Sequence, residues 1–278
     1  MTCSFLAKPS FESRVHSAKG SLVPTERRTW SQNELLVVFR LYCRTPFGRL
    51  HQRNPEIIGL AHLIDRTPSA VAMKACNFAS LDPQQQVRSI QGLGNVSRAD
   101  RELWEAFRRD SEAIAHAAET ANTALFGEKP EQDVQEFALP EGPTEKEMIV
   151  KARRVQSFFR AAVISSYDNR CALTDLAIPE LLNASHIIPW RVDRTRRADP
   201  RNGICLNVLH DRAFDRGLIT FDEDFRMVVS PLLSCSENSE FQRRVFTATA
   251  GRKIRLPVRF LPDEEAIAYH RQRVFRES

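Results

Sequence analysis

The sequence predicts an α+β protein of 278 residues in two parts, a helical N-terminal part and a C-terminal part built around a strand–loop–strand–helix unit. Two observations lead to this prediction. Up to about residue 126, apolar residues recur at helical spacing, and the runs begin at residues that cap helices. Further along, apolar runs at 181–188 and 204–209 enclose a polar loop and precede a short helical segment.

Helix start signals define the N-terminal part. Ser31, followed three residues later by Glu34, forms a capping box that predicts a helix beginning there. Residues 55–64 predict a second helix with a proline in its first turn, and Thr67 with the proline after it predicts a third. A single long amphipathic helix is expected over residues 97–126.

The stretch at 127–145 has a different composition. It carries six acidic residues and one lysine, and its prolines and glycines predict an exposed linker. A helix is expected over about 144–167, a β-hairpin over 218–229 and a last helix over about 263–275. We therefore predict four segments, which are a flexible tail at 1–28, a helical domain at 29–126, the linker at 127–145 and a second domain at 146–278.

Composition narrows the class of protein. The hydrophobic fraction of 42% is ordinary for a globular protein, and no stretch reaches the roughly 20 apolar residues of a membrane span. The first residues lack the apolar core of a secretory signal. Six cysteines without a CxxC pair favour reduced thiols in the cytoplasm. A net charge of +5 favours an anionic partner but does not identify it.

Two neighbouring motifs carry the strongest functional signal. Ala-Ser-His-Ile-Ile-Pro-Trp at 184–190 ends one apolar run, and Pro-Arg-Asn-Gly-Ile-Cys-Leu-Asn-Val-Leu-His at 200–210 contains the next. They place His186, Asn202 and His210 in order, with fifteen and then seven residues between them. The polar segment that begins at His210 stops at a glycine and predicts a short helix.

Strand, long loop, strand, helix is the order of the ββα-metal finger of HNH nucleases. Residues 144–278 resemble this family, in particular the branch with "SHI-x-PW" and "LHDRAFDRGLI". The resemblance implies that His186 is the general base, that His210 binds a divalent cation, and that Asn202 braces the loop. A neutral imidazole can activate the water, and the cation can neutralise the phosphate and assist the leaving oxygen. Mg²⁺ is expected, with Mn²⁺ or Ni²⁺ as substitutes.

One position departs from the family pattern. Many members place Asp or His directly before the catalytic histidine as a further ligand, and this chain has Ser185 there. Ser185 would be a weak ligand, so Asp211 or Asp215 is a candidate to complete the metal shell. Both aspartates also suit helix-cap or salt-bridge roles. Cys171 and Cys205 lack CxxC partners, so no structural zinc is expected.

Arginines surround the motif. Five arginines in the loop between His186 and Asn202 are expected to contact DNA phosphates without reading the base sequence. They are Arg191, Arg194, Arg196, Arg197 and Arg201. The alternative is pairing with Asp193 and Asp199 on a solvated loop. Arg212 or Arg216 would stabilise the charged phosphorus centre, and the sequence does not choose between them.

The N-terminal pattern resembles the Myb/SANT type of three-helix, helix-turn-helix domain. Trp30-Ser-x-x-Glu, the apolar run at 57–64 and Arg-Thr-Pro-Ser-Ala-Val at 66–71 carry this resemblance. It implies that residues 29–126 bind DNA, with 68–79 as the recognition helix and with Lys74 and Asn77 facing outward. A dimerisation or regulatory bundle would share the same apolar spacing.

The sequence thus predicts a cytoplasmic, metal-dependent endonuclease that hydrolyses double-stranded DNA in bacterial restriction or defence. A DNA-binding regulator with an inactive finger is the alternative, and an RNA-cleaving toxin is a third class. Whether cleavage depends on modified bases, whether two chains form a homodimer and which site is recognised all stay open.

Overall fold

The computed structural model describes residues 28–87, 96–127, 143–233 and 239–277. Within these ranges, contacts join the chain from residue 31 onward into one compact unit. The predicted tail at 1–28 and linker at 127–145 lie mostly outside the described residues. Both segments, and the predicted domain boundaries, therefore stay predictions.

The protein is α+β, as predicted, and helices dominate the described residues. The strands form two antiparallel pairs, β1 with β2 and β3 with β4. The elements in chain order are α1 (Gln32–Arg44), η1 (Phe47–Arg49), α2 (Pro55–Leu63), α3 (Pro68–Leu81), α4 (Pro83–Val87), α5 (Arg98–Arg109), α6 (Ser111–Phe126), α7 (Pro143–Ser166), η2 (Pro179–Leu181), β1 (Leu182–His186), η3 (Pro200–Asn202), β2 (Gly203–Asn207), α8 (Val208–Asp215), β3 (Ile219–Phe221), β4 (Met227–Val229), η4 (Pro231–Leu233), α9 (Glu240–Val245), η5 (Thr247–Thr249) and α10 (Glu264–Arg273).

The predicted helix starts are confirmed. The hydroxyl of Ser31 accepts a hydrogen bond from the Glu34 N–H at 3.2 Å, and the Glu34 carboxylate accepts one from the Ser31 N–H at 2.7 Å. This reciprocal capping box satisfies two otherwise unpaired donors at the start of α1. The hydroxyl of Thr67 caps α3 in the same way, by accepting from the Ala70 N–H.

The single long helix expected over 97–126 is wrong, because the chain breaks into α5 and α6 at Asp110. The backbone of Asp110 leaves the helical region, with φ −146° and ψ 84°. Its carboxylate then accepts a hydrogen bond from the Ala113 N–H at 2.9 Å and so caps α6. The break lets α6 pack against α5 rather than continue it.

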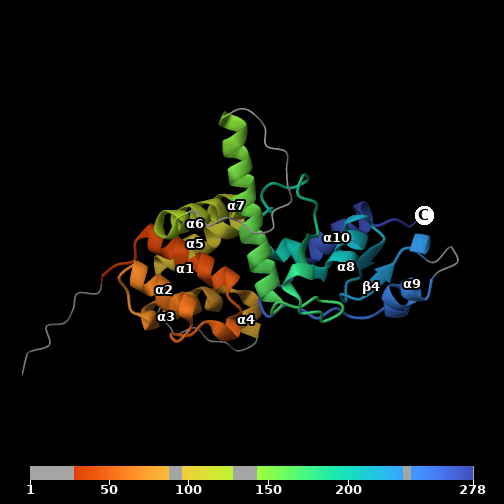
Figure 1. The fold of residues 1–278 in the computed structure, drawn as a ribbon, viewed down its shortest axis with the longest axis horizontal. Coiled ribbons are helices and arrows are strands. Elements are labelled where there is room, and N and C mark those ends of the chain that lie inside the picture. Colours follow the sequence, from red (N-terminus) through yellow and green to blue (C-terminus); the bar gives the residue numbers. More distant parts are fainter. Residues whose placement is uncertain (1–27, 88–95, 128–142, 234–238, 278) are drawn as a thin grey trace, which may run out of the picture. The chain divides into compact units, whose positions relative to one another are not determined.

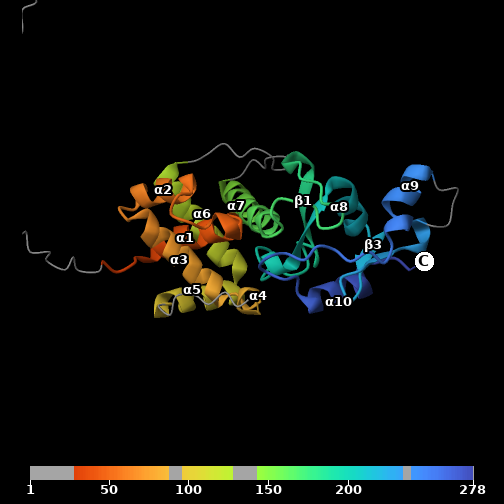
Figure 2. The ribbon, with the colours of Figure 1, turned by 90° about the horizontal axis from the view of Figure 1, so that it is seen from below.

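Helix α7 is shared by the two parts of the fold. Helices α1 and α6 pack against one side of it, and strands β1 and β2 pack against another (Figures 1 and 2). The ring of Phe158 meets the ring of Phe107 at 5.9 Å in the helical part, whereas Phe159 belongs to the C-terminal core. Neighbouring residues of α7 thus serve different cores.

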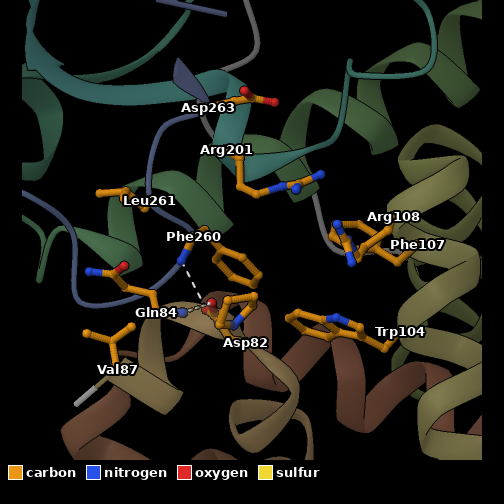
Figure 3. Close-up of a pocket in the computed structure, with 11 residues that line it drawn as sticks. Asp82, Gln84, Val87, Trp104, Phe107, Arg108, Arg201, Phe260, Leu261 and Asp263 are labelled. Carbon is orange, nitrogen blue, oxygen red and sulfur yellow. Dashed lines mark hydrogen bonds between the residues drawn. The ribbon is translucent and has the colours of Figure 1, made fainter. Parts of the chain in front are cut away.

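A C-terminal segment, residues 258–261, fastens the helical part to α7. The buried guanidinium of Arg259 donates hydrogen bonds to two carbonyl groups at the end of α1 and to the Ser165 hydroxyl. A helix C-terminus favours a cation, because its last carbonyls lack partners within the helix. The N–H of Phe260 also donates to the carboxylate of Asp82 at 3.0 Å (Figure 3).

Aromatic rings fill the space beside this segment. The ring of Trp104 stacks on the ring of Phe260 with centroids 6.1 Å apart, and Phe39 meets Phe107 edge to face at 4.9 Å. A cavity of about 320 Å³ opens next to Trp104, Phe107 and Phe260 (Figure 3). The helical part and the C-terminal segment therefore share one apolar core.

The strand pair β1–β2 is confirmed where the sequence predicted it, and its register sets His186 opposite Gly203. A Cβ atom at Gly203 would lie 2.4 Å from a methyl carbon of Val163 and 2.7 Å from the ring of Phe159. Glycine is required here because α7 approaches the strand too closely for any side chain. The predicted second hairpin is also confirmed, as β3 and β4. Among the described helices, none has the length and apolar character of a membrane span.

Candidate active site

Strand β1 presents its side chains alternately to two helices. Asn183 and Ser185 point toward α8, where both hydrogen-bond the carboxylate of Asp211, at 2.7 Å and 2.5 Å. His186 points toward α7, where its ring stacks on that of Phe159 with centroids 3.7 Å apart. The strand thus brings a histidine and a carboxylate to the same region of the fold.

The ring of His186 is held in one orientation. Phe159 covers one face, and Trp190 meets it edge to face at 5.5 Å. Its Nε2 lies 3.0 Å from the carbonyl oxygen of Arg197. Because a carbonyl oxygen only accepts hydrogen bonds, Nε2 carries the proton and Nδ1 carries the lone pair. Burial lowers the pKa of His186 to about 4, so the imidazole is neutral at physiological pH.

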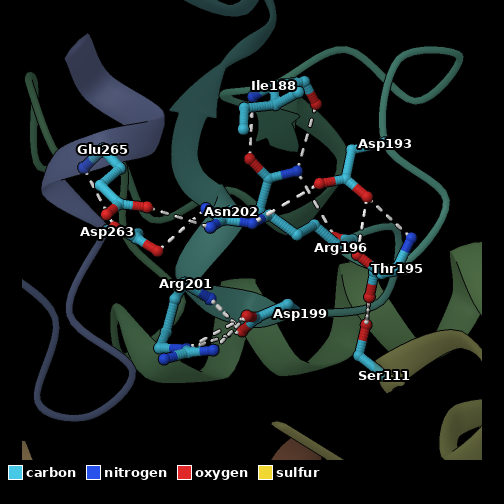
Figure 4. A network of polar contacts seen from close by, with 10 residues as sticks. All are labelled: Ser111, Ile188, Asp193, Thr195, Arg196, Asp199, Arg201, Asn202, Asp263 and Glu265. Carbon is cyan, nitrogen blue, oxygen red and sulfur yellow. Dashed lines mark hydrogen bonds and ion pairs between the residues drawn. The ribbon is translucent and has the colours of Figure 1, made fainter. Parts of the chain in front are cut away.

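Asn202 braces the loop that follows His186. Its Oδ1 accepts from the N–H of Ile188 at 2.8 Å, and its Nδ2 donates to the carbonyls of Ile188 at 3.1 Å and Arg196 at 3.4 Å (Figure 4). The side chain is buried, so these hydrogen bonds take the place of bonds to water. The carbonyl that faces His186 belongs to Arg197, which directly follows Arg196 in this loop.

Asp211 and Asp215 bring two carboxylates to one side of α8. Burial first, and then the charge of Asp211, raise the pKa of Asp215 to about 6. Within the described part of the chain, neither carboxylate forms an ion pair. The oxygen atoms of Asp211, Asp215 and Ser185 are the hard ligands that Mg²⁺ prefers, and Mg²⁺ keeps several waters when few protein ligands are present.

The structure does not place His210, the expected metal ligand, at the cleft, and its role as a ligand stays a prediction. The residue is 2% exposed and does not line the cleft that contains His186. Its Nδ1 lies 3.0 Å from the Asn207 Oδ1 and its Nε2 lies 3.4 Å from the Val245 carbonyl. The ring also meets Phe246 edge to face. Burial lowers the pKa of His210, and a neutral imidazole donates through one nitrogen only, so the shorter contact, to Asn207 at the start of α8, is the hydrogen bond. Asp211, which lines the cleft, is the better placed candidate ligand in this structure.

These residues open onto a broad cleft of about 1260 Å³. Ser185, His186 and Asp211 lie along it, together with Asp215. Its most frequent residue is arginine, and the arginines that line it are Arg40, Arg44, Arg153, Arg154, Arg160, Arg191, Arg212, Arg216 and Arg273. A neutral histidine and carboxylate oxygens in an arginine-lined cleft suit the hydrolysis of a phosphodiester.

The comparison with known families agrees with this chemistry. Residues 171–222 match the family model described as HNH endonuclease. This segment contains β1, the loop, β2 and α8. The chain carries an HNH endonuclease domain. No curated protein matches the chain in sequence. The family match indicates a nuclease and does not extend to the N-terminal helices.

The loop of the HNH domain uses three of its arginines internally. Arg196 pairs with Asp263 at 2.9 Å and Arg201 with Asp199 at 2.6 Å (Figure 4). Arg197 lies over the ring of Trp190 at 4.8 Å and donates to the carbonyl of that residue. These three arginines hold the loop in this structure, and the phosphate contacts expected of them stay predictions.

The other two loop arginines, Arg191 and Arg194, are exposed and form no ion pair with any residue the structure describes. Arg212 on α8 and Arg216 directly after this helix are likewise exposed, and both line the cleft. These four stay candidates for phosphate contact, because they are exposed and form no ion pair within the described part of the chain, although Arg212 and Arg216 lie close enough to Asp215 to lower its pKa.

Lys74 and Asn77 do not face outward, so that expectation is wrong. Both are buried, and the Lys74 ammonium pairs with Asp100 of α5 at 2.8 Å. The Asn77 amide donates to the same carboxylate at 3.3 Å. Helix α3 uses this face to pack on α5 and does not offer it to DNA. The orientation of α3 depends on a contact with another helix, because Asp100 lies 26 residues from Lys74 in the sequence. The helical periodicity of α3 alone cannot report this contact.

Sequence reasoning missed three residues of the site, Asn183, Phe159 and Arg160. Asn183 donates to Asp211 and accepts from Arg160 of α7 at 3.3 Å. Phe159 supports the base ring. The alternation of a strand was a usable signal for Asn183, because it lies two residues before Ser185. No local signal predicts that Phe159 and Arg160 of α7 contact the site, because these contacts arise from tertiary packing.

No three His, Cys, Asp or Glu side chains among the described residues are grouped to hold a metal ion. The donor set at Asp211 is nevertheless chemically suited to one weakly held, hard cation, with waters and phosphate oxygens completing the shell. Cys171 and Cys205 are buried thiols of the core.

Proposed function

We propose that the protein is a metal-dependent endonuclease that hydrolyses phosphodiester bonds of double-stranded DNA. The observation that carries this proposal is the neutral, oriented imidazole of His186 in an arginine-lined cleft that also holds the carboxylate of Asp211. The match of this segment to HNH endonucleases supports the same reaction.

His186 acts as the general base. With Nε2–H donating to the Arg197 carbonyl, the lone pair on Nδ1 accepts a proton from the attacking water. The carbonyl stabilises the imidazolium that forms, because it accepts the Nε2–H more strongly once the ring is charged. Asn202 keeps this carbonyl in place by bonding the loop on either side.

Asp211 would hold a divalent cation, with Ser185 and Asp215 as supporting oxygen ligands. When bound, Mg²⁺ (or Mn²⁺ or Ni²⁺) neutralises charge on the phosphate and stabilises the leaving oxygen. The amide of Asn183 orients the carboxylate of Asp211 by donating to it. Arg212 and Arg216, exposed beside it on the cleft, are suited to bind the phosphate oxygens.

A role in bacterial restriction or defence, acting on foreign or modified DNA, is the cellular context that we propose for this cleavage. The support is the combination of a nuclease domain with a packed helical part. Cleavage of modified and unmodified genomic DNA in parallel tests it. Equal cleavage of the two DNAs would show that cleavage does not depend on base modification.

Plasmid cleavage tests the proposed activity. Supercoiled plasmid is incubated with the full chain and Mg²⁺ or Mn²⁺, with His186→Ala as the test variant and His62→Ala as the control. His62 is exposed on α2 and lies outside the cleft. Wild type and His62→Ala should nick the plasmid and His186→Ala should not. Equal nicking by all three proteins, or nicking by none, contradicts the proposal.

A DNA-binding regulator with an inactive finger is the second candidate. The observation in its favour is Ser185, which replaces the usual acidic or histidine ligand and leaves Asp211 with few partners for a cation. This candidate predicts plasmid binding by gel shift without nicking by any variant at any divalent cation tested.

A further inference from the structure

The cleft that holds His186 has a second wall, which is made by α1 and α7. Five of its arginines come from these two helices, namely Arg40, Arg44, Arg153, Arg154 and Arg160. Carboxylates are far fewer, and those that line the whole cleft are Glu119, Asp211 and Asp215. The wall therefore extends the positive charge of the active site onto the helical part.

Two of these five arginines, Arg44 and Arg153, have no acidic partner among the described residues. The guanidinium of Arg40, in contrast, is balanced by Glu119 at 2.7 Å. The Nε of Arg153 is buried and has no hydrogen-bond partner among the described residues. A buried donor without a partner costs free energy, which a bound anion would recover.

The charges around Arg44 also favour a bound anion. Partial desolvation, and then repulsion from Arg40, lower the pKa of its guanidinium. Lysines and arginines that crowd one another raise the local potential and attract anions from solution. Glu56 and Glu119 oppose this shift, but the pKa of Arg44 stays below its usual value, so the neighbouring acids do not fully compensate for its lost hydration and for the charge of Arg40.

The wall and the active site belong to one packed unit. Helix α7 contacts α1, β1 and β2, and Arg259 ties the end of α1 to α7 through buried hydrogen bonds. A ligand that reaches from His186 to Arg44 must carry negative charge along its length. The sugar-phosphate backbone of a nucleic acid has this property.

We propose that Arg44 and Arg153 bind phosphates of duplex DNA that flank the scissile bond, so that α1 and α7 form the second wall of the substrate cleft. This inference rests on the proposed nuclease function. It assigns DNA contact in the helical part to α1 and α7 rather than to α3, whose Lys74 and Asn77 are buried against Asp100. Contacts of this kind fix the position of the DNA and carry no sequence information.

Salt-dependent binding tests the proposal. A labelled short duplex is titrated with the full-length chain in chelator, at several salt concentrations, and binding is followed by fluorescence anisotropy. The variants are Arg44→Gln, Arg153→Gln and the double variant. Arg109→Gln, an exposed arginine on α5 outside the cleft, is the matched control because it loses the same charge. Unchanged thermal unfolding midpoints establish that each variant is folded.

Each cleft variant should weaken binding roughly three- to tenfold and reduce the slope of log K against log salt by about 0.9, with the double variant losing about twice that. The control should match wild type. Slopes for all variants equal to that of the control overturn the proposal. An effect on duplex RNA or tRNA binding but not on duplex DNA overturns the assignment to DNA.

The outcome is separable from that of the nuclease proposal. If wild type nicks plasmid while the cleft variants bind like wild type, this inference alone fails. If no variant nicks plasmid while the salt slopes change as expected, the nuclease function fails and the DNA-binding wall stands.

Discussion

Asp211 and His210 are adjacent, and substituting each in turn tests the proposal that Asp211, and not His210, binds the metal. Asp211→Asn removes the negative charge and leaves the shape of the side chain. Changes in groups that merely support a metal ligand already cost about 10- to 100-fold. The loss for Asp211→Asn should therefore be at least about 100-fold in the metal-dependent cleavage rate. Its free energy of unfolding should change little, because the amide can still hydrogen-bond Ser185.

His210→Gln should show the opposite pattern. The change removes a hydrogen bond to the Asn207 side chain, a longer contact to the Val245 carbonyl and the edge-to-face contact with Phe246. At about 1 kcal/mol for a hydrogen bond and a similar amount for the aromatic pair, the free energy of unfolding should fall by about 2 kcal/mol. The cleavage rate per folded molecule should stay within about threefold of wild type, since that corresponds to well under 1 kcal/mol.

Urea unfolding and single-turnover cleavage of a short duplex, measured on both variants, separate the two effects. Mn²⁺ titration of each variant adds a direct readout of cation affinity. The reasoning is refuted if His210→Gln is folded but has lost cleavage and cation affinity as completely as Asp211→Asn. His210 would then be the ligand, and α8 would have to turn relative to the structure described.

Three further predictions concern the support of the site. Gly203→Ala should cost about 1–3 kcal/mol of stability by urea unfolding, because its Cβ would overlap Val163 and Phe159, and a neutral effect would contradict the close packing. Asn202→Ala should lower the cleavage rate about 10- to 100-fold while DNA affinity stays at the wild-type value, and reduced affinity with an unchanged rate would argue against a positioning role. Burial lowers the pKa of His270 to about 4, so the unfolded chain takes up this proton first as the pH falls. The resulting stability is complete above about pH 6.5 and is lost toward about pH 4, by about 3 kcal/mol, and His270→Gln should flatten that part of the pH dependence of unfolding.

Local signals in the sequence were sufficient for most element boundaries. The capping box at Ser31 and the cap at Thr67 act within three residues, so their consequences can be read without knowing the fold. Asp110 was missed because strong helix formers lie on both sides of it. The cap that Asp110 makes with the Ala113 N–H is local, but the packing of α6 against α5 that accompanies the break is not reported by any local pattern.

Orientation between elements is where sequence reasoning was insufficient. His210 and Asp211 are adjacent, so spacing alone cannot tell which of them the rotation of α8 turns toward β1. The hydrogen bonds from Asn183 and Ser185 decide in favour of Asp211. Lys74 was expected outside for a similar reason, because its partner Asp100 lies on another helix.

The central claim is that His186 supplies the base for phosphodiester hydrolysis. The measurement that tests it most directly is the single-turnover cleavage rate of a short DNA duplex at saturating protein, for wild type, His186→Ala and His62→Ala, with DNA affinity measured separately. The account predicts a rate roughly 100- to 10,000-fold lower for His186→Ala, with affinity and folding unchanged and His62→Ala equal to wild type. A folded His186→Ala protein that binds and cleaves the duplex at the wild-type rate would contradict it.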